Sequence, residues 1–143
     1  MTVISELDQF RGETLPRQLT AERAIHNGDV EPRLAMWSQR DPVTLFGALG
    51  PCKSGWRDVS RIFRWVASRF SDLSDYDFEV IAAGVSGDLA YTVGYEHSTV
   101  SVDGAAPTTQ TIRVTHIYRR EDGEWRVVHR HGDHLPVDQS RKA

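Results

Sequence analysis

The most constraining feature of this 143-residue sequence is a change in the spacing of its apolar residues near Tyr76. Before Tyr76 the apolar residues recur every three or four positions, which is the spacing of one face of an α-helix. After Tyr76 they alternate in strand-like runs that are joined by short turns containing glycine, which predicts an antiparallel meander. Helices followed by a meander favour an α+β fold, with the helices packed on one face of a curved sheet.

The helical part contains one clear amphipathic helix and weaker segments before it. Residues 54–70 follow the i, i+3, i+4 pattern of a helix with one buried face. Pro16 interrupts an earlier helical pattern, so we expect a helix over 16–26 that ends at Asn27-Gly28. Asp29 is expected to cap a short helix that follows. The predicted strands span 43–46, 78–86, 89–102, 108–120 and 125–131.

Composition excludes several classes of protein. The 17 basic and 20 acidic residues give a net charge of −3, which disfavours a nucleic-acid-binding surface. The single cysteine, Cys52, excludes an internal disulfide and the usual Cys-rich zinc sites. No run approaches the roughly 18 apolar residues of a membrane helix, and the first residues do not resemble a signal peptide. We therefore expect one cytoplasmic domain over 1–143, with a flexible tail at 136–143.

The chain ends its meander in DGEWRVVHRH at residues 122–131. With the Asn27-Gly28-Asp29 break and the long helix, this pattern resembles the nuclear transport factor 2-like superfamily over about residues 17–134. Within it, the chain is most similar to SnoaL-like, ketosteroid-isomerase-related proteins, and its last strand also resembles the association domain of calcium/calmodulin-dependent kinase. The resemblance implies a cone-shaped α+β fold with a pocket between helices and sheet, usually in a homodimer.

The catalytic residues of ketosteroid isomerase have no counterpart at the matching positions. The position of its base falls at Leu45 or Phe46, and its oxyanion-binding positions fall near Ala21 and Thr115. None of these side chains can abstract a proton in that way. SnoaL-like cyclases resemble one another in an acidic residue that points inward from a late strand of the sheet. The late strand of this sequence has His129, Arg130 and His131 instead. An isomerase, cyclase or hydratase activity of another kind is left open.

The resemblance also implies which strand faces line the cone. The expected ligand-binding residues are Trp37, Phe46, Trp56, Phe63, Tyr91, Tyr95, Arg113, Thr115, Val128, His129 and Arg130. An aromatic cavity with one or two cations suits a flat, apolar ligand that carries an acid or a carbonyl. In the alternative interpretation the aromatic residues fill the core, and Arg113 and Arg130 form ion pairs, with Glu96 as a partner.

The histidines of the last strand offer a metal-binding alternative. His129, His131, Asp133 and His134 match the His-x-His-x-Asp-His spacing of a zinc site. Few residues follow this motif to complete such a site, so we expect neither a metal nor a cofactor. His129 and His131 are then strand histidines that bond to backbone or carboxylates.

Two other histidines are single. His26 is expected to cap helix carbonyls, and His116 is expected at a surface or an interface.

Three functions remain after these arguments. The preferred one is binding, and conversion if the protein is an enzyme, of a small hydrophobic or aromatic molecule in the cone. The alternative is a non-enzymatic homo-oligomerisation module, which the last strand favours. The third is a metal-dependent hydrolase that uses the histidine motif. No nucleic-acid or membrane partner is expected.

Overall fold

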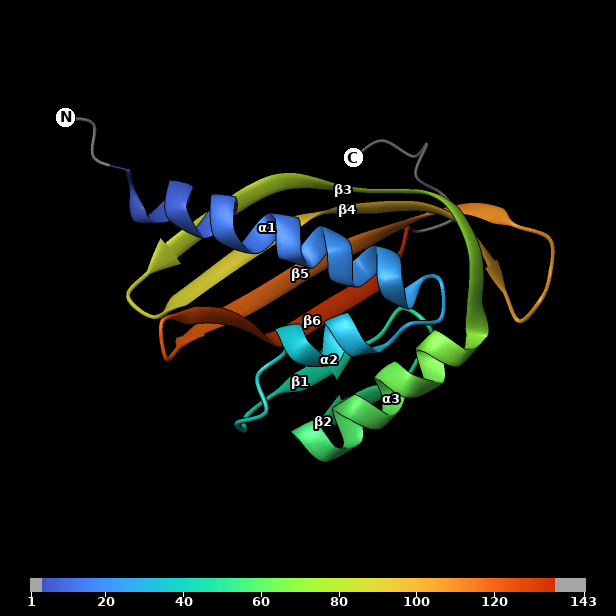
Figure 1. Cartoon of the computed structure of the whole chain (residues 1–143), viewed down its shortest axis with the longest axis horizontal. Coiled ribbons are helices and arrows are strands. Elements are labelled where there is room, and N and C mark those ends of the chain that lie inside the picture. Colours follow the sequence, from blue (N-terminus) through green and yellow to red (C-terminus); the bar gives the residue numbers. More distant parts are fainter. Residues whose placement is uncertain (1–3, 136–143) are drawn as a thin grey trace, which may run out of the picture.

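The computed structural model describes residues 4–135, and the predicted flexible tail at 136–143 lies outside the described residues. Helices and a small hairpin precede four long strands, which confirms the predicted α+β fold (Figure 1). The helices are α1 (Glu6–Ile25), α2 (Glu31–Met36) and α3 (Trp56–Arg69). The strands are β1 (Thr44–Phe46), β2 (Cys52–Ser54), β3 (Phe70–Ser86), β4 (Leu89–Val102), β5 (Thr108–Glu121) and β6 (Glu124–His134).

Helix α1 is continuous, so the predicted interruption at Pro16 is wrong. The helix begins where the Ser5 hydroxyl accepts a hydrogen bond from the Asp8 N–H at 3.1 Å. Pro16 cannot donate to the Gly12 carbonyl, but both residues are exposed, so water can satisfy that carbonyl. The predicted end is correct, because Gly28 follows the helix with a φ of 87°, in the left-handed region.

The two shorter helices follow their sequence signals closely. The N-cap residue of α2 is Val30, which makes no side-chain cap, so the expected cap at Asp29 is wrong by one position. Asp29, the residue before it, accepts a hydrogen bond from the Glu31 N–H at 3.1 Å. Helix α3 lies within the predicted range and buries Phe63 completely. The ring of Phe63 meets the ring of Trp37 edge to face at 4.7 Å, which fixes α3 against the segment after α2.

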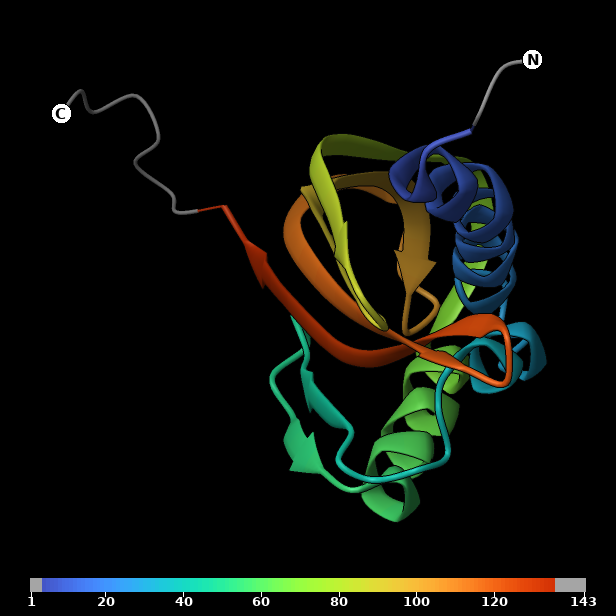
Figure 2. The same ribbon diagram turned by 90° about the vertical axis from the view of Figure 1, so that its left-hand side faces the viewer.

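The six strands form one open sheet in the order β2-β1-β6-β5-β4-β3. The meander from β3 to β6 is antiparallel as predicted. Strand β1, which lies outside the meander, pairs with β6 in parallel, so the sheet as a whole is mixed. The sheet curls around the side on which α1 and α3 pack (Figure 2). We call that side the inner face and the opposite side the outer face.

The phase of the strand alternation decides which side chains reach the interior. In β4 the even-numbered residues 90–100 are all buried, whereas the odd-numbered residues 91–99 are exposed or half-buried. In β6 an irregularity in the pairing with β5 leaves Val128 as an extra residue between two paired positions. Val127 and Val128 are therefore both buried, and Arg130 points inward.

Candidate functional site

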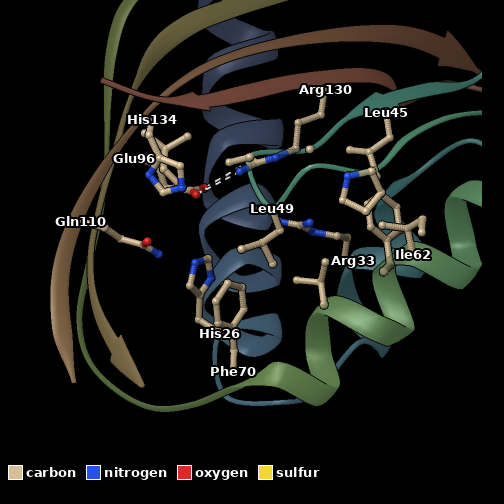
Figure 3. Close-up of a pocket in the computed structure, with 16 residues that line it drawn as sticks. His26, Arg33, Leu45, Leu49, Ile62, Phe70, Glu96, Gln110, Arg130 and His134 are labelled. Atoms are coloured by element: carbon tan, nitrogen blue, oxygen red, sulfur yellow. Dashed lines mark hydrogen bonds and ion pairs between the residues drawn. The ribbon is translucent and has the colours of Figure 1, made fainter. Parts of the chain in front are cut away.

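An interior cavity of about 50 Å³ lies between α3, the inner face of the sheet and the loop that joins β1 and β2 (Figure 3). Its apolar lining comprises Leu45, Gly47, Ala48, Leu49, Pro51, Ile62, Phe63, Val66, Phe70 and Ile112. Its polar lining comprises His26, Arg33, Glu96, Gln110, Arg130 and His134. A cavity of roughly 150 Å³ holds benzene, so this one is smaller than an aromatic ring requires.

A buried ion pair forms one end of the cavity. Arg130 Nη2 donates to Glu96 Oε1 at 3.0 Å, and Arg130 Nη1 lies 3.3 Å from Glu96 Oε2 (Figure 3). The Tyr76 hydroxyl donates to Glu96 Oε2 at 2.6 Å. The expected alternative for Arg130, an ion pair with Glu96, is therefore present. A paired and fully hydrogen-bonded carboxylate can remain charged in the interior.

A second ion pair joins α1 to α2 behind the first. Arg33 donates to Glu22, and Arg130 Nη1 also lies 3.6 Å from Glu22 Oε2. Gln18 donates to Glu22 Oε1 at 2.9 Å and accepts a hydrogen bond from the Tyr118 hydroxyl at 2.8 Å. The two arginines and two glutamates carry equal and opposite charge, so this buried group is neutral as a whole.

These contacts fix the protonation of the first ion pair. Burial opposes the charge on Glu96, but the neighbouring Arg130 outweighs it, so the pKa of Glu96 lies well below its usual value. Burial also works against the charge on Arg130, and Glu96 and Glu22 more than compensate, so its pKa is raised. Burial, reinforced by the nearby Glu96, raises the pKa of Tyr76. Glu96 is thus an ionised acceptor and not a proton donor near neutral pH.

His116 is buried beside Arg130, so its expected place at a surface or interface is wrong. It lies on the same face of β5 as the buried Val114 and Tyr118, because the even-numbered positions of this strand point inward. Burial, with a further contribution from Arg130, lowers the pKa of His116 well below its usual value. The neutral ring accepts from Arg130 Nη1 at 3.3 Å through Nε2.

His26 caps the C-terminal end of α1, as predicted, and also faces the cavity. Its Nδ1 lies 2.6 Å from the Glu22 carbonyl oxygen. The ring stacks on Phe70 with a centroid distance of 4.9 Å and an interplanar angle of 6°. The imidazole is therefore held in place from two sides, with its other edge toward the cavity.

The four predicted ligand-binding residues of β4 and β5 lie on the outer face and do not line the cone as expected. They are Tyr91, Tyr95, Arg113 and Thr115. Tyr95, Arg113 and Thr115 border a shallow hollow on that face instead, where Arg113 binds Asp133 at 2.8 and 2.9 Å. The inner positions of β4 carry mostly small or polar residues, so residue size alone indicates the wrong face.

The remaining predicted ligand-binding residues divide between the cavity, the core and the surface. Phe63 and Arg130 line the cavity as expected. Trp37 and Val128 are buried in the same core cluster, and Trp56 is partly buried against it. None of the three lines the cavity. Phe46 and His129 point to the outer face, where the Phe46 ring meets His129 edge to face at 5.4 Å.

The histidine motif of β6 does not form a metal centre. Within residues 4–135, no three histidine, cysteine or acidic side chains are placed to hold a metal ion. Asp133 is held by Arg113, and His134 lines the cavity, whereas His129 bonds to the Thr44 hydroxyl at 2.7 Å. Alternation along the strand sends the motif's side chains to opposite faces of the sheet.

The functional residues that sequence reasoning missed come from the helices. Arg33, Glu22 and Gln18 join the buried network, and His26 reaches the cavity from the end of α1. A signal was available in α1, because Thr14, Gln18, Glu22 and His26 recur every four residues and are all buried. A polar stripe along the inner face of a helix indicates a buried network that requires partners.

A curved, open sheet that encloses a cavity against helices from the first half of the chain defines the nuclear transport factor 2-like fold. The family model of the SnoaL-like domain matches residues 20–137, and the chain belongs to this family. No curated protein matches the sequence significantly. In the described part of the chain, no helix has the length and apolar character that a bilayer crossing requires.

Solved structures with low sequence identity share the fold. A protein from Streptomyces avermitilis, described as a candidate dehydratase of the nuclear transport factor 2-like family, is 18% identical with a TM-score of 0.74. That match covers 91% of this chain and 99% of the other. The association domain of Caenorhabditis elegans calcium/calmodulin-dependent kinase II is 15% identical with a TM-score of 0.65. It covers 89% of this chain and 97% of the other, and such identities establish the fold alone.

Proposed function

We propose that this SnoaL-like protein binds a small molecule with an apolar part and a polar oxygen group in its interior cavity. The observation that best supports this proposal is that the lining of the cavity divides into an apolar wall and a polar wall. Helix α3 and the loop after β1 supply apolar side chains, and the opposite wall presents the Arg130–Glu96 pair. Pockets that combine an apolar wall with a few convergent polar groups are typical small-molecule sites. The dehydratase description of the Streptomyces protein agrees with such a site.

Entry of an aromatic ligand requires a wall of the cavity to move. The loop from Gly47 to Pro51 is suited to this, because few backbone hydrogen bonds hold it together. They run from the Gly47 N–H to the Pro51 carbonyl and from the Gly50 N–H to the Gly47 carbonyl. Leu49 of this loop lies directly over the cavity (Figure 3). A segment with few internal hydrogen bonds opens at low free-energy cost compared with the helices and sheet.

Native mass spectrometry of untagged protein, purified gently, tests the proposal. We expect an organic adduct that is retained by the wild type and lost in Val66→Phe, since the added ring fills the cavity. Ser68→Phe on the same helix is the matched control, because Ser68 is exposed and does not line the cavity. Loss of the adduct in both variants, or its persistence in Val66→Phe, contradicts binding in the cavity.

A homo-oligomer formed through the outer face is a second proposed function, and a specific observation favours it. This face exposes a row of large apolar side chains from β3, β4 and β5: Ile81, Leu89, Tyr91, Val93 and Ile117. Extended apolar surface of this kind marks interfaces. Arg113 and Asp133, which border the adjoining hollow, form an ion pair, so this pair presents no net charge to a second copy.

Sedimentation velocity tests this second proposal. We expect a dimer for the wild type and a monomer for Val93→Glu, because a carboxylate buried in an apolar interface is unpaired. Gln39→Glu adds the same charge at an exposed site away from this face and should leave the dimer intact. A monomeric wild type, or a dimer that survives Val93→Glu unchanged, would overturn the outer-face interface.

A further inference from the structure

Two polar atoms at the cavity have no hydrogen-bond partner among residues 4–135. The Nε of Arg33 is a buried donor without an acceptor, although the same guanidinium binds Glu22 through Nη2. The Nε2 of His26 makes no hydrogen bond, because the contact of this ring to the protein is made through Nδ1. Both side chains line the cavity and project toward its centre (Figure 3). A buried donor left without an acceptor is destabilising, so a ligand acceptor beside Arg33 Nε improves the structure. His26 Nε2 is a second position at which a ligand can form a hydrogen bond.

The contact of His26 with the backbone fixes what its free nitrogen can do. The partner of Nδ1 is a carbonyl oxygen, which can only accept, so Nδ1 carries the proton. In the neutral form of the ring, Nε2 then carries the lone pair and accepts a hydrogen bond from a ligand. Stacking on Phe70 holds the ring in this orientation.

The charges around the cavity decide the charge of the ligand. Arg33 and Arg130 are matched by Glu22 and Glu96, and all four side chains are buried. An anionic ligand would therefore add an unbalanced charge to a group that is already neutral, and burial of an unpaired charge is costly. A neutral ligand adds no such charge.

We infer that the cavity binds a small neutral hydroxycarbonyl compound, whose hydroxyl donates to His26 Nε2 and whose carbonyl oxygen accepts from Arg33 Nε. Its hydrocarbon part lies against Ile62 and Val66 of α3. This inference rests on the proposed small-molecule function and assigns the ligand class of that same site.

The test uses two probes of nearly equal size and methyl NMR of the full chain. Hydroxyacetone carries both groups, whereas 2-butanone has a methyl group in place of the hydroxyl. We expect both to shift the methyl signals of Ile62 and Val66, with hydroxyacetone binding about threefold to tenfold more tightly, as one additional hydrogen bond provides. A long-range ¹H–¹⁵N spectrum of the unmodified protein should show His26 protonated at Nδ1 and its Nε2 signal shifted by hydroxyacetone alone.

Variants assign the preference to His26. His26→Phe keeps the stacking on Phe70, removes the acceptor, and should make the two probes bind equally. His26→Gln restores an acceptor and should recover part of the preference. His116→Phe alters an equally buried histidine that does not line the cavity, and it should keep the preference.

The outcomes separate this inference from the proposed function. Equal binding of both probes to the wild type, with the methyl shifts still present, overturns the hydroxycarbonyl class and leaves the cavity function intact. Absence of methyl shifts with either probe overturns both. Tighter binding of lactate than of hydroxyacetone overturns the assignment of a neutral ligand.

Discussion

At the scale of single residues, buried polar groups determine the character of this interior. Glu96 keeps its charge because Arg130 and the Tyr76 hydroxyl bind both of its oxygens. His116 loses its charge because burial and the adjacent Arg130 both disfavour the protonated ring. Glu96 is therefore charged and His116 is neutral, although both lie beside Arg130, because their contacts differ.

The lowered pKa of His116 makes stability depend on pH in a predictable direction. The unfolded chain binds a proton at this histidine near pH 6.5, whereas the folded chain does not. Its contribution is therefore present above pH 6.5 and is lost as the pH falls toward the lowered pKa of the folded state, at up to about 1.4 kcal/mol per pH unit. We expect His116→Gln to flatten the slope of the free energy of unfolding between pH 6.5 and 5, measured with urea. His131→Gln, at an exposed site, should leave the slope unchanged; an unchanged slope in His116→Gln contradicts the assignment.

Removal of both partners of the buried ion pair should reduce stability by less than the sum of the two single removals. Arg130→Met leaves Glu96 charged and unmatched and should reduce the free energy of unfolding by about 3–5 kcal/mol. The double variant Arg130→Met/Glu96→Gln should lose clearly less than the sum of the two single variants, because no unmatched charge remains. Urea denaturation of the four proteins measures the coupling, and additive losses would show that the two side chains act independently.

The sequence allowed only part of this residue-scale description. An ion pair between Arg130 and Glu96 could be anticipated, because buried arginine needs an acceptor. Which side chains of β4 point inward could not be anticipated, because this depends on which residues the helices cover. By size, Tyr91 and Tyr95 look like core residues. Arg33 could not be placed either, since its partner Glu22 lies on another helix.

At the scale of helices and strands, the local sequence patterns predicted an element correctly where the packing of the folded protein favours the same element. Helix α3 and the turns of the meander follow their patterns because the apolar residues and glycines alone specify them. Helix α1 departs from its pattern, because burial of Phe10 and Ile25 at its two ends stabilises the whole helix against one missing hydrogen bond at Pro16. The parallel pairing of β1 with β6 joins residues far apart in sequence, so no local signal reports it.

Pro16 therefore stands at a position where alanine is the better residue. Pro16→Ala restores the hydrogen bond to the Gly12 carbonyl and removes the clash with it, while the unfolded chain regains some conformational freedom. We expect a net gain of about 2 kcal/mol in the free energy of unfolding by urea denaturation. Arg11→Ala, at another exposed site of α1, should change stability by less than about 0.5 kcal/mol. A loss of stability in Pro16→Ala would mean that the proline ring packs on a neighbour.

At the scale of the whole molecule, the sheet separates the two proposed functions. The cavity lies on its inner face, and the exposed apolar row lies on its outer face. We expect Val93→Glu to dissociate the dimer while the dissociation constant for hydroxyacetone stays within about twofold of the wild type. Val66→Phe should do the reverse, with no binding and an intact dimer. Sedimentation velocity and NMR titration of both variants provide the measurement, and a joint loss in either variant would show that the two faces are coupled.

The loop over the cavity has a consequence for how proteins with this architecture diverge. Its five residues, 47–51, supply a substantial part of the apolar wall but none of the buried ion pairs, and it joins the short strands β1 and β2 at one end of the sheet. Mutations there alter the shape of the binding space without disturbing the charge network that holds the helices to the sheet. Selection can therefore change ligand preference and keep the scaffold, and directed evolution toward new ligands would best begin with a library over this loop.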